Sequence, residues 1–191
     1  MIHDHERSGW FGASDTGKIV GSWETPTFEK WWMVKLGIRQ ENFTTDAMLT
    51  GTAFEHRILE HIGIRKMDRQ IRISRLRLRI NLDGETKDEI SEVKTYGKDH
   101  FVVSKAYWQQ CQAEMFGAKK QCRIVAYHLL PEDYLNWFSP IDDARISYYP
   151  IQYDAEWVKT EYLPRLIYLS NCLKKGVWPN ADEQRTLAAG Q

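Results

Sequence analysis

Several common functional features are absent from this chain of 191 residues. Its three cysteines, Cys111, Cys122 and Cys172, form no C-x-x-C pair, and three thiols cannot all be joined in disulfides. Its six histidines show no HExxH or other zinc-binding spacing. The formal net charge is zero, so the chain has no general affinity for polyanions, and any nucleic-acid surface has to be a local patch.

Long hydrophobic runs are also absent, both in the interior of the chain and at its N-terminus. Together with the unpaired cysteines, this indicates a protein of a reducing, cytoplasmic compartment with no membrane partner. The sequence has no repeat and no low-complexity segment. Its eight tryptophans are many for this length, and we interpret most of them as core residues.

The hydrophobic pattern predicts one domain over residues 1–179, followed by a loose tail over 180–191. The expected helices cover residues 14–21, 27–36, 45–62, 104–119 and 154–175, the last with a kink at Pro164. The expected strands cover residues 70–74, 75–83, 89–95, 123–130 and 146–153. This order is typical of an α/β (α+β) fold with a mixed central β-sheet flanked by helices.

The expected helix over residues 45–62 carries an acid on its apolar side. Thr45 can cap its N-terminus. Glu55 shares a face with the apolar or small residues Met48, Gly51, Ile58 and Ile62. Because an isolated buried carboxylate is very costly, Glu55 has to be paired, protonated or bound to a metal ion.

Residues 75–83 alternate strictly between polar and apolar side chains, which predicts a half-buried strand that ends in Asp83. The polar face carries a basic stripe, made of Arg75, Arg77 and Arg79, on the same side as Asp83. This stripe can follow a nucleic-acid backbone. A solvated sheet face, or a cover for acidic partners, explains it equally well.

Two Glu-x-Lys sequences, at residues 85–87 and 92–94, compete as the next part of the site. Glu85 follows Asp83 by two residues in an expected turn over 84–88, where it would be solvated and mobile. The second copy lies in the following strand, which a short turn can bring beside Asp83. We therefore select the second copy.

Alternation puts Glu92 and Lys94 on one face of that strand, with the Val93 carbonyl between them. The carboxylates of Glu55, Asp83 and Glu92 would repel one another, and a hard divalent ion such as Mg²⁺ removes this conflict. Such an ion polarises a phosphate and orients a water, which Lys94 can hold or deprotonate. The alternative is that these acids belong to turns and the surface, with Lys94 paired to one of them.

Three further residues are candidates in this context. Gln110 lies one helical turn after Tyr107, where it can orient the water or a phosphate oxygen. Arg7 and Ser14 flank a glycine-containing turn that leads into a helix start, with Ser14 as the expected N-cap. Such a turn can form an anion pocket.

In this order, the motifs resemble the phage lambda exonuclease (YqaJ-type) branch of the PD-(D/E)XK nucleases. The resemblance covers about residues 7–119 and is carried by Arg7-Ser8-Gly9, Phe54-Glu55, Leu82-Asp83-Gly84, Glu92-Val93-Lys94 and Tyr107-x-x-Gln110. It implies a restriction-endonuclease-like core and a Mg²⁺-dependent exonuclease that digests one strand of duplex DNA from its end, in the 5′→3′ direction, for recombination. It also implies a phage- or prophage-encoded protein in the cytoplasm of a bacterial host.

The resemblance also assigns roles to residues and partners. It implies that Mg²⁺, or Mn²⁺ in its place, is bound by Glu55, Asp83, Glu92 and the Val93 carbonyl. It makes Lys94 the catalytic lysine and Gln110 its polar support, and it places the DNA 5′-phosphate on Arg7 and Ser14. The implied partners are duplex DNA ends, a single-strand annealing protein and two further copies in a homotrimer. Three unpaired cysteines lead us to expect no iron–sulfur cluster.

Three positions depart from the family pattern. Leu82 replaces the proline that the family usually has before its aspartate, and His3 replaces the family's tryptophan. Asn81 stands where lambda-type enzymes have a serine near the phosphate pocket. The alternatives are an endonuclease of the same fold and a non-catalytic nucleic-acid-binding module. A structural protein with a tryptophan-rich core is a third alternative.

Overall fold

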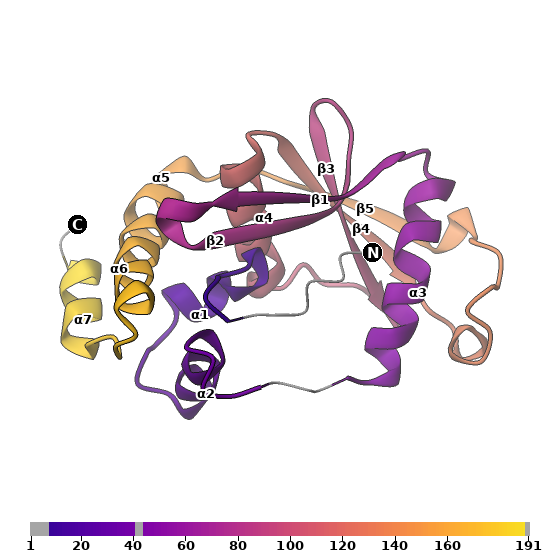
Figure 1. The fold of residues 1–191 in the computed structure, drawn as a ribbon. Coiled ribbons are helices and arrows are strands. Elements are labelled where there is room, and N and C mark those ends of the chain that lie inside the picture. The colour runs from indigo at the N-terminus through magenta and orange to yellow at the C-terminus, as the bar shows by residue number, and fades with distance from the viewer. Residues whose placement is uncertain (1–7, 41–43, 190–191) are drawn as a thin grey trace.

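The computed structural model describes residues 8–40 and 44–189 of the chain. Its centre is a five-stranded sheet in the order β1-β2-β3-β4-β5 (Figure 1). The strands are β1 (Lys66–Ile73), β2 (Leu78–Glu85), β3 (Glu89–Tyr96), β4 (Gln121–His128) and β5 (Ile146–Ile151). Strands β3 and β4 pair in parallel, whereas the other neighbours pair antiparallel.

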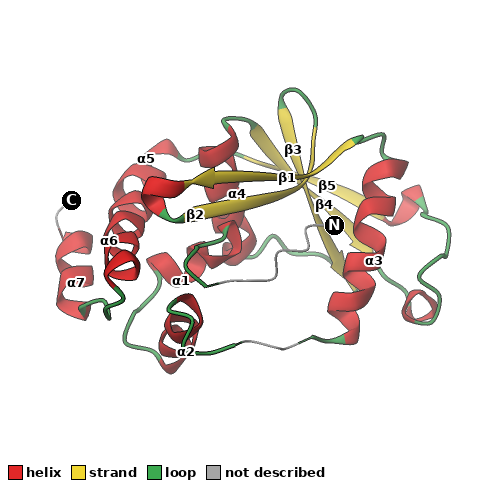
Figure 2. Cartoon of the chain, viewed as in Figure 1, coloured by secondary structure: helices red, strands yellow, loops and turns green. Residues whose placement is uncertain are grey.

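Helices lie on both sides of this sheet (Figure 2). They are α1 (Thr16–Val20), α2 (Pro26–Lys35), α3 (Asp46–His61), α4 (Lys105–Ala118), α5 (Ala155–Trp157), α6 (Leu163–Lys175) and α7 (Ala181–Ala189). Helix α4 is the crossover that the parallel pair β3 and β4 requires. The predicted fold class, a mixed sheet flanked by helices, is confirmed. Within the described ranges, every helix is too short or too polar to cross a membrane.

The alternation of side chains along β4 divides the core into two clusters. Cys122 and Ile124 pack into the larger cluster, which also holds residues of α1, α2, α4 and α6. Val125 and Tyr127 point to the opposite face and pack into the smaller cluster beneath α3. Three tryptophans are buried in the larger cluster, as expected for core residues: Trp23, Trp31 and Trp32.

Strands β2 and β3 pair through only two described residue pairs, Gly84 with Ser91 and Glu85 with Ile90. Beyond these pairs the strands diverge, which leaves Asp83 and Glu92 on the two arms of a fork. Helix α3 packs tightly here, because a Cβ added at Gly84 would lie 2.7 Å from Cδ2 of Leu59. The glycine therefore allows α3 to approach the fork.

The start of the predicted strand over 75–83 is wrong. Residues Ser74–Leu76 form a 3₁₀ turn, and Arg77 is left-handed with a φ of 49°, so β2 begins at Leu78. Leu76 is nevertheless buried, so the alternating pattern continues through the turn. At the other end, Glu85 still belongs to β2 rather than to the predicted turn.

Two features at the C-terminal end also bear on the prediction. The helix expected over 154–175 changes to a π-helical turn at Val158–Tyr162, directly before the turn that contains Pro164, so the predicted break is confirmed. The tail expected to be loose contains α7 instead. The Gln184 side chain of α7 accepts a hydrogen bond from the Trp23 amide at 3.0 Å, so this prediction is wrong for residues 181–189.

Candidate active site

Helix α3 carries Glu55, the first acid of the candidate site. The Thr45 hydroxyl caps the helix, as predicted, by accepting a hydrogen bond from the Met48 amide at 3.2 Å. The buried face consists of Thr50, Phe54, Ile58 and Leu59. Met48 is 48% exposed, so it does not belong to the apolar stripe expected for it. Glu55 lies beside Phe54 at the edge of this face and is partly buried.

The next two acids, Asp83 and Glu92, lie at the fork between β2 and β3. Oδ2 of Asp83 accepts a hydrogen bond from the Val93 amide at 2.8 Å, which ties the two arms together. Glu92 is 2% exposed. Its Oε2 is buried without a hydrogen-bond partner among the described residues. An acceptor oxygen is therefore left available at the fork.

Lys94 and Gln110 complete the cluster from β3 and α4. Nζ of Lys94 lies 2.6 Å from Oε1 of Glu92 and 3.4 Å from Oε1 of Gln110. Nε2 of Gln110 donates a hydrogen bond to Oε1 of Glu92 at 2.5 Å. Capping of α4 by the Ser104 hydroxyl, which accepts from the Tyr107 amide, fixes the start of the helix that carries Gln110.

Repulsion among the acids dominates the electrostatics of this cluster. Burial, and then the charges of Glu92 and Glu55, raise the pKa of Asp83 well above its usual value. Burial and the charge of Glu92 likewise raise the pKa of Glu55. Burial alone would lower the pKa of Lys94, but the charges of Glu92 and Asp83 outweigh it and raise that pKa. Lys94 is therefore held protonated, as a hydrogen-bond donor rather than a base.

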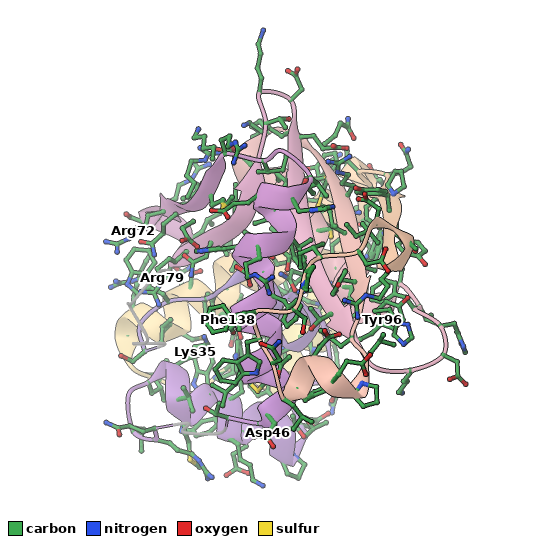
Figure 3. All side chains as sticks on the ribbon, turned by 90° about the vertical axis from the view of Figure 1, so that its right-hand side faces the viewer. Lys35, Asp46, Arg72, Arg79, Tyr96 and Phe138 are labelled. Carbon is green, nitrogen blue, oxygen red and sulfur yellow. The ribbon has the colours of Figure 1, made fainter. Side chains whose placement is uncertain are left out.

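A cleft of about 410 Å³ opens beside this cluster. It is lined by Glu55, Val93 and Lys94, and also by Met48, Tyr96 and Tyr134. Figure 3 shows Tyr96 and Phe138 on the side of the molecule that carries α3. Glu55 and Lys94 are thus accessible to a substrate from that side.

Three acids or histidines near the site were not predicted from the sequence. His56 follows Glu55 on α3, and its Nε2 lies 3.0 Å from Oδ2 of Asp68. Ligand atoms of Glu55, His56 and Asp68 all lie within 4.8 Å of one another. Asp68 has a left-handed φ of 56° inside β1, and no sequence pattern predicts such a backbone conformation. Glu114 accepts a hydrogen bond from Gln110 four residues earlier, a spacing that the sequence does contain.

Of the predicted phosphate pocket the structure describes only Ser14, and the basic stripe is not formed as expected. Arg7 lies outside the described residues. Ser14 is exposed and is not the N-cap: Gly12 is, and the Asp15 carboxylate accepts the Gly12 N–H at 2.7 Å. Asp15 also pairs with Lys35 at 2.6 Å.

Of the three arginines in the stripe, only Arg79 lies with Asp83 on β2. The guanidinium of Arg77 lies 5.7 Å from the centre of the Trp10 ring, and Arg75 belongs to the preceding turn. Arg79 instead pairs in register with Arg72 of β1, and Figure 3 shows these two side chains close together. The continuous stripe on one strand face is therefore incorrect.

Comparison with known proteins places this geometry in context. No protein-family description and no curated protein sequence matches the chain. An alkaline exonuclease from Laribacter hongkongensis is similar in structure, with a TM-score of 0.63 at 18% identity over 96% of this chain and 95% of that one. A phage-related exonuclease from Haemophilus somnus has a TM-score of 0.64 at 15% identity over 93% and 95% of the two chains. The chain therefore has the fold of these two exonucleases, in agreement with the resemblance in its sequence.

Proposed function

We propose that this protein is a metal-dependent exonuclease that digests one strand of duplex DNA from its end. The observation that carries the proposal is the meeting of Asp83, Glu92, Lys94 and Gln110 at the fork of the sheet, with Glu55 close enough to perturb them. The fold shared with two exonucleases supports it. The 5′→3′ direction and a role in recombination follow from the sequence resemblance and belong to the proposal.

The donor atoms at the fork suit Mg²⁺ or Mn²⁺. Oε2 of Glu92 is a buried carboxylate oxygen without a hydrogen-bond partner in residues 8–40 and 44–189, and such an atom is costly unless a cation or water satisfies it. Glu55, Asp83, Glu92 and the Val93 carbonyl offer oxygen ligands, which hard divalent cations prefer. When bound, the cation would polarise the scissile phosphate and stabilise the developing negative charge.

The protein's own residues then orient the reactants. Lys94 is partly buried, lines the cleft and is held protonated by the neighbouring acids, so it can donate to a non-bridging oxygen of the phosphate or to the attacking water. Gln110 restrains Glu92 and Lys94 through its amide. Arg7 and Ser14 are proposed to hold the terminal 5′-phosphate, which would select ends over internal positions.

Digestion of two DNA forms in Mg²⁺ tests this function. An exonuclease degrades a linear duplex and leaves a closed circle intact, and a 5′-phosphate on the linear end should accelerate the digestion. Linearisation of the circle would favour an endonuclease of the same fold. Binding of both DNA forms without cleavage would favour a non-catalytic module.

A further inference from the structure

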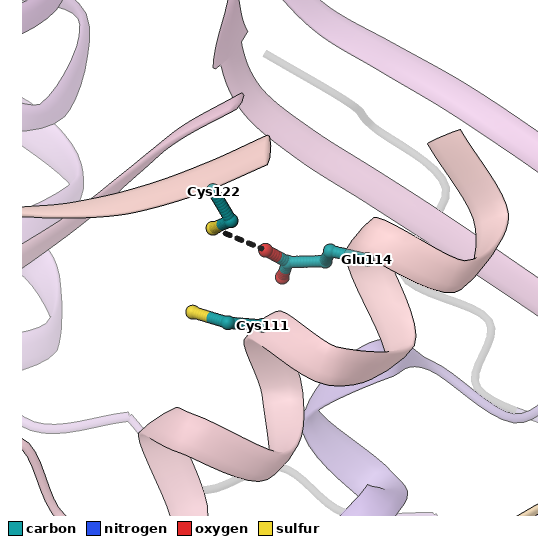
Figure 4. Close-up of side chains that lie close together, drawn as sticks. All are labelled: Cys111, Glu114 and Cys122. Atoms are coloured by element: carbon teal, nitrogen blue, oxygen red, sulfur yellow. Dashed lines mark hydrogen bonds between the residues drawn. The ribbon is translucent and has the colours of Figure 1, made fainter. Parts of the chain in front are cut away.

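Glu114 on α4 is a fully buried acid that the proposed reaction does not use. It is 0% exposed, and its carboxyl group lies beside the thiols of Cys111 and Cys122 (Figure 4). Among the described residues it forms no ion pair. Its polar contacts are the Gln110 amide, at 2.8 Å from Oε1, and the Cys122 thiol, at 3.9 Å from Oε2.

The hydrogen bond from Gln110 to Glu114 determines the orientation of the Gln110 side-chain amide. Both N–H groups of Gln110 Nε2 are used, one toward Glu92 at 2.5 Å and one toward Glu114 at 2.8 Å. This leaves Oε1 of Gln110 facing Nζ of Lys94 at 3.4 Å. A flipped amide would place its oxygen against two carboxyl groups and its nitrogen against the lysine, so the two acids together fix the orientation.

Glu114 provides this acceptor without adding negative charge to the site. Burial, and then the charge of Glu92, raise its pKa well above the usual value. A protonated carboxyl group keeps an acceptor oxygen for Gln110 and avoids further repulsion of Glu92. A charged acid at this depth would need a cation of its own.

We propose that Glu114 is a positioning residue for the nuclease reaction: it orients the Gln110 amide, which in turn holds Oε1 of Glu92 and leaves Oε2 of Glu92 available at the fork. This inference rests on the proposed function, because Gln110 and Glu92 have a catalytic role only in that reaction. It requires only the contacts of Gln110 with Glu92, Lys94 and Glu114.

Two substitutions separate the acceptor from the volume of the side chain. Glu114→Gln keeps an acceptor oxygen and resembles the protonated acid, so kcat should stay within about threefold of wild type. Glu114→Met fills the space but removes the acceptor, so kcat should fall by about tenfold or more while KM for DNA stays unchanged. Gln112→Met is the matched control: it removes a buried amide of the same helix that bonds to Gln152 and Asp154, and it should leave kcat unchanged.

A double-mutant cycle then identifies the route of the effect. If Glu114 acts through Gln110, then Glu114→Met should cause no further loss of kcat in a Gln110→Ala background. Additive losses would overturn the proposal, as would wild-type kcat in Glu114→Met.

A measurement without catalysis keeps this inference separate from the proposed function. In protein with ¹⁵N-labelled glutamine, the side-chain amide of Gln110, assigned through Gln110→Ala, should be protected from solvent exchange in wild type and in Glu114→Gln. The protection should be lost in Glu114→Met. Protection that survives Glu114→Met would overturn the positioning role, whereas an inactive wild type with the predicted amide behaviour would overturn only the nuclease assignment.

Discussion

At the scale of single residues, the two Glu-x-Lys sequences have opposite environments. Glu92 lies at the fork, where Lys94 at 2.6 Å is its ion-pair partner among the described residues. Glu85 is also buried, but its carboxylate lies 2.6–2.7 Å from nitrogens of Lys66, Arg69 and Lys120. Three cations surround one acid there, so Glu85 is already neutralised and has a structural role. The expectation that Glu85 is solvated in a turn is wrong.

The lysines of the two copies should therefore differ in their effect on cleavage. Lys94→Met removes the charge that balances Asp83 and Glu92, and we expect the single-turnover cleavage rate to fall by about 100-fold or more. Lys87→Met changes an exposed turn residue and serves as the control, with cleavage unchanged. Equal rates for the two variants would contradict the assignment of Lys94. DNA affinity measured in Ca²⁺ should be similar in both.

Glu85 gives a second prediction, on stability. Burial alone would raise the pKa of Glu85, but hydrogen bonds from Lys120 and Lys66 and the charge of Arg69 outweigh it and lower that pKa. Glu85→Ala leaves three cations around an empty position, which should reduce the free energy of unfolding by about 2 kcal/mol, less than for a fully buried pair because Lys66 is largely exposed. Urea denaturation measures this loss. A stability equal to wild type would show that the cations do not depend on Glu85.

Spacing along the sequence selects Glu55, Asp83, Glu92 and Lys94 as neighbours, whereas the choice of Gln110 rests on the context of these residues. Helical and strand periodicity decides which side chains share a face, and a short turn decides which strands are adjacent. Sequence spacing could not show that Asp68 lies near the site, because a left-handed aspartate inside a strand depends on tertiary packing. Nor could it show that Glu85 is buried, since the partner Lys120 is 35 residues away in the chain.

At the scale of secondary-structure elements, α7 closes over the N-terminal part of the larger core cluster. Gln184 bonds to the Trp23 amide and the Gly21 carbonyl, and Arg185 pairs with Glu24 at 2.8 Å. Leu187 packs against the same cluster. Sequence alone predicts a loose tail here because the segment is short and polar, and its order comes from contacts about 160 residues away.

Removing this helix should weaken the cluster without affecting the chemistry. We expect deletion of residues 180–191 to lower the free energy of unfolding by about 1–2 kcal/mol, through loss of the Gln184 hydrogen bonds and partial exposure of Trp23. Thermal unfolding and a red shift of tryptophan fluorescence report the change. Gln184→Ala should reproduce part of it. Unaltered stability after the deletion would mean that α7 is not docked in solution.

The start of β2 shows that an alternating pattern of polar and apolar residues does not always mark a strand. A 3₁₀ turn and a left-handed Arg77 keep Leu76 and Leu78 both buried, so polar and apolar residues alternate through a segment that is not a strand. The basic stripe was inferred from this pattern. It separates into individual arginines because the backbone changes direction at residue 77.

At the scale of the whole molecule, the acids of the fork should make stability depend on pH and metal together. The folded-state pKa values of Glu55 and Asp83 are raised, so their contribution to stability is present at low pH and is lost as the pH rises through these raised values. Asp15 and Glu85 have lowered pKa values, so their contribution changes only below the usual carboxyl range.

We therefore expect the thermal shift caused by Mn²⁺ to be larger at about pH 8 than at about pH 5.5, because the cation binds the ionised acids. Without metal, the melting temperature should fall over the same interval. Asp83→Asn should remove most of the metal-dependent shift. A Mn²⁺ shift that is equal at both pH values, or unchanged in Asp83→Asn, would contradict metal binding at the fork.

Assembly is the remaining prediction at this scale. Leu135 is 91% exposed and Phe138 is 85% exposed in the segment between β4 and β5, and large apolar side chains together at a surface favour a protein contact. The proposed ring of three subunits would place this segment in a subunit interface. Light scattering should then give three times the chain mass of 22.5 kDa, and Phe138→Ser should lower it. A mass of one chain in wild type would exclude a stable ring.

In the proposed reaction, the acids at the fork perform Mg²⁺-dependent cleavage. The most direct test is nucleotide release from a linear 5′-phosphorylated duplex by wild type, Glu92→Gln and Glu85→Gln, each with Mg²⁺ and with a chelator, at a temperature where all three are folded. We expect release by wild type and Glu85→Gln only in Mg²⁺, and no release by Glu92→Gln although it still binds DNA. Cleavage by Glu92→Gln at the wild-type rate, or cleavage that persists in the chelator, would contradict the proposed reaction.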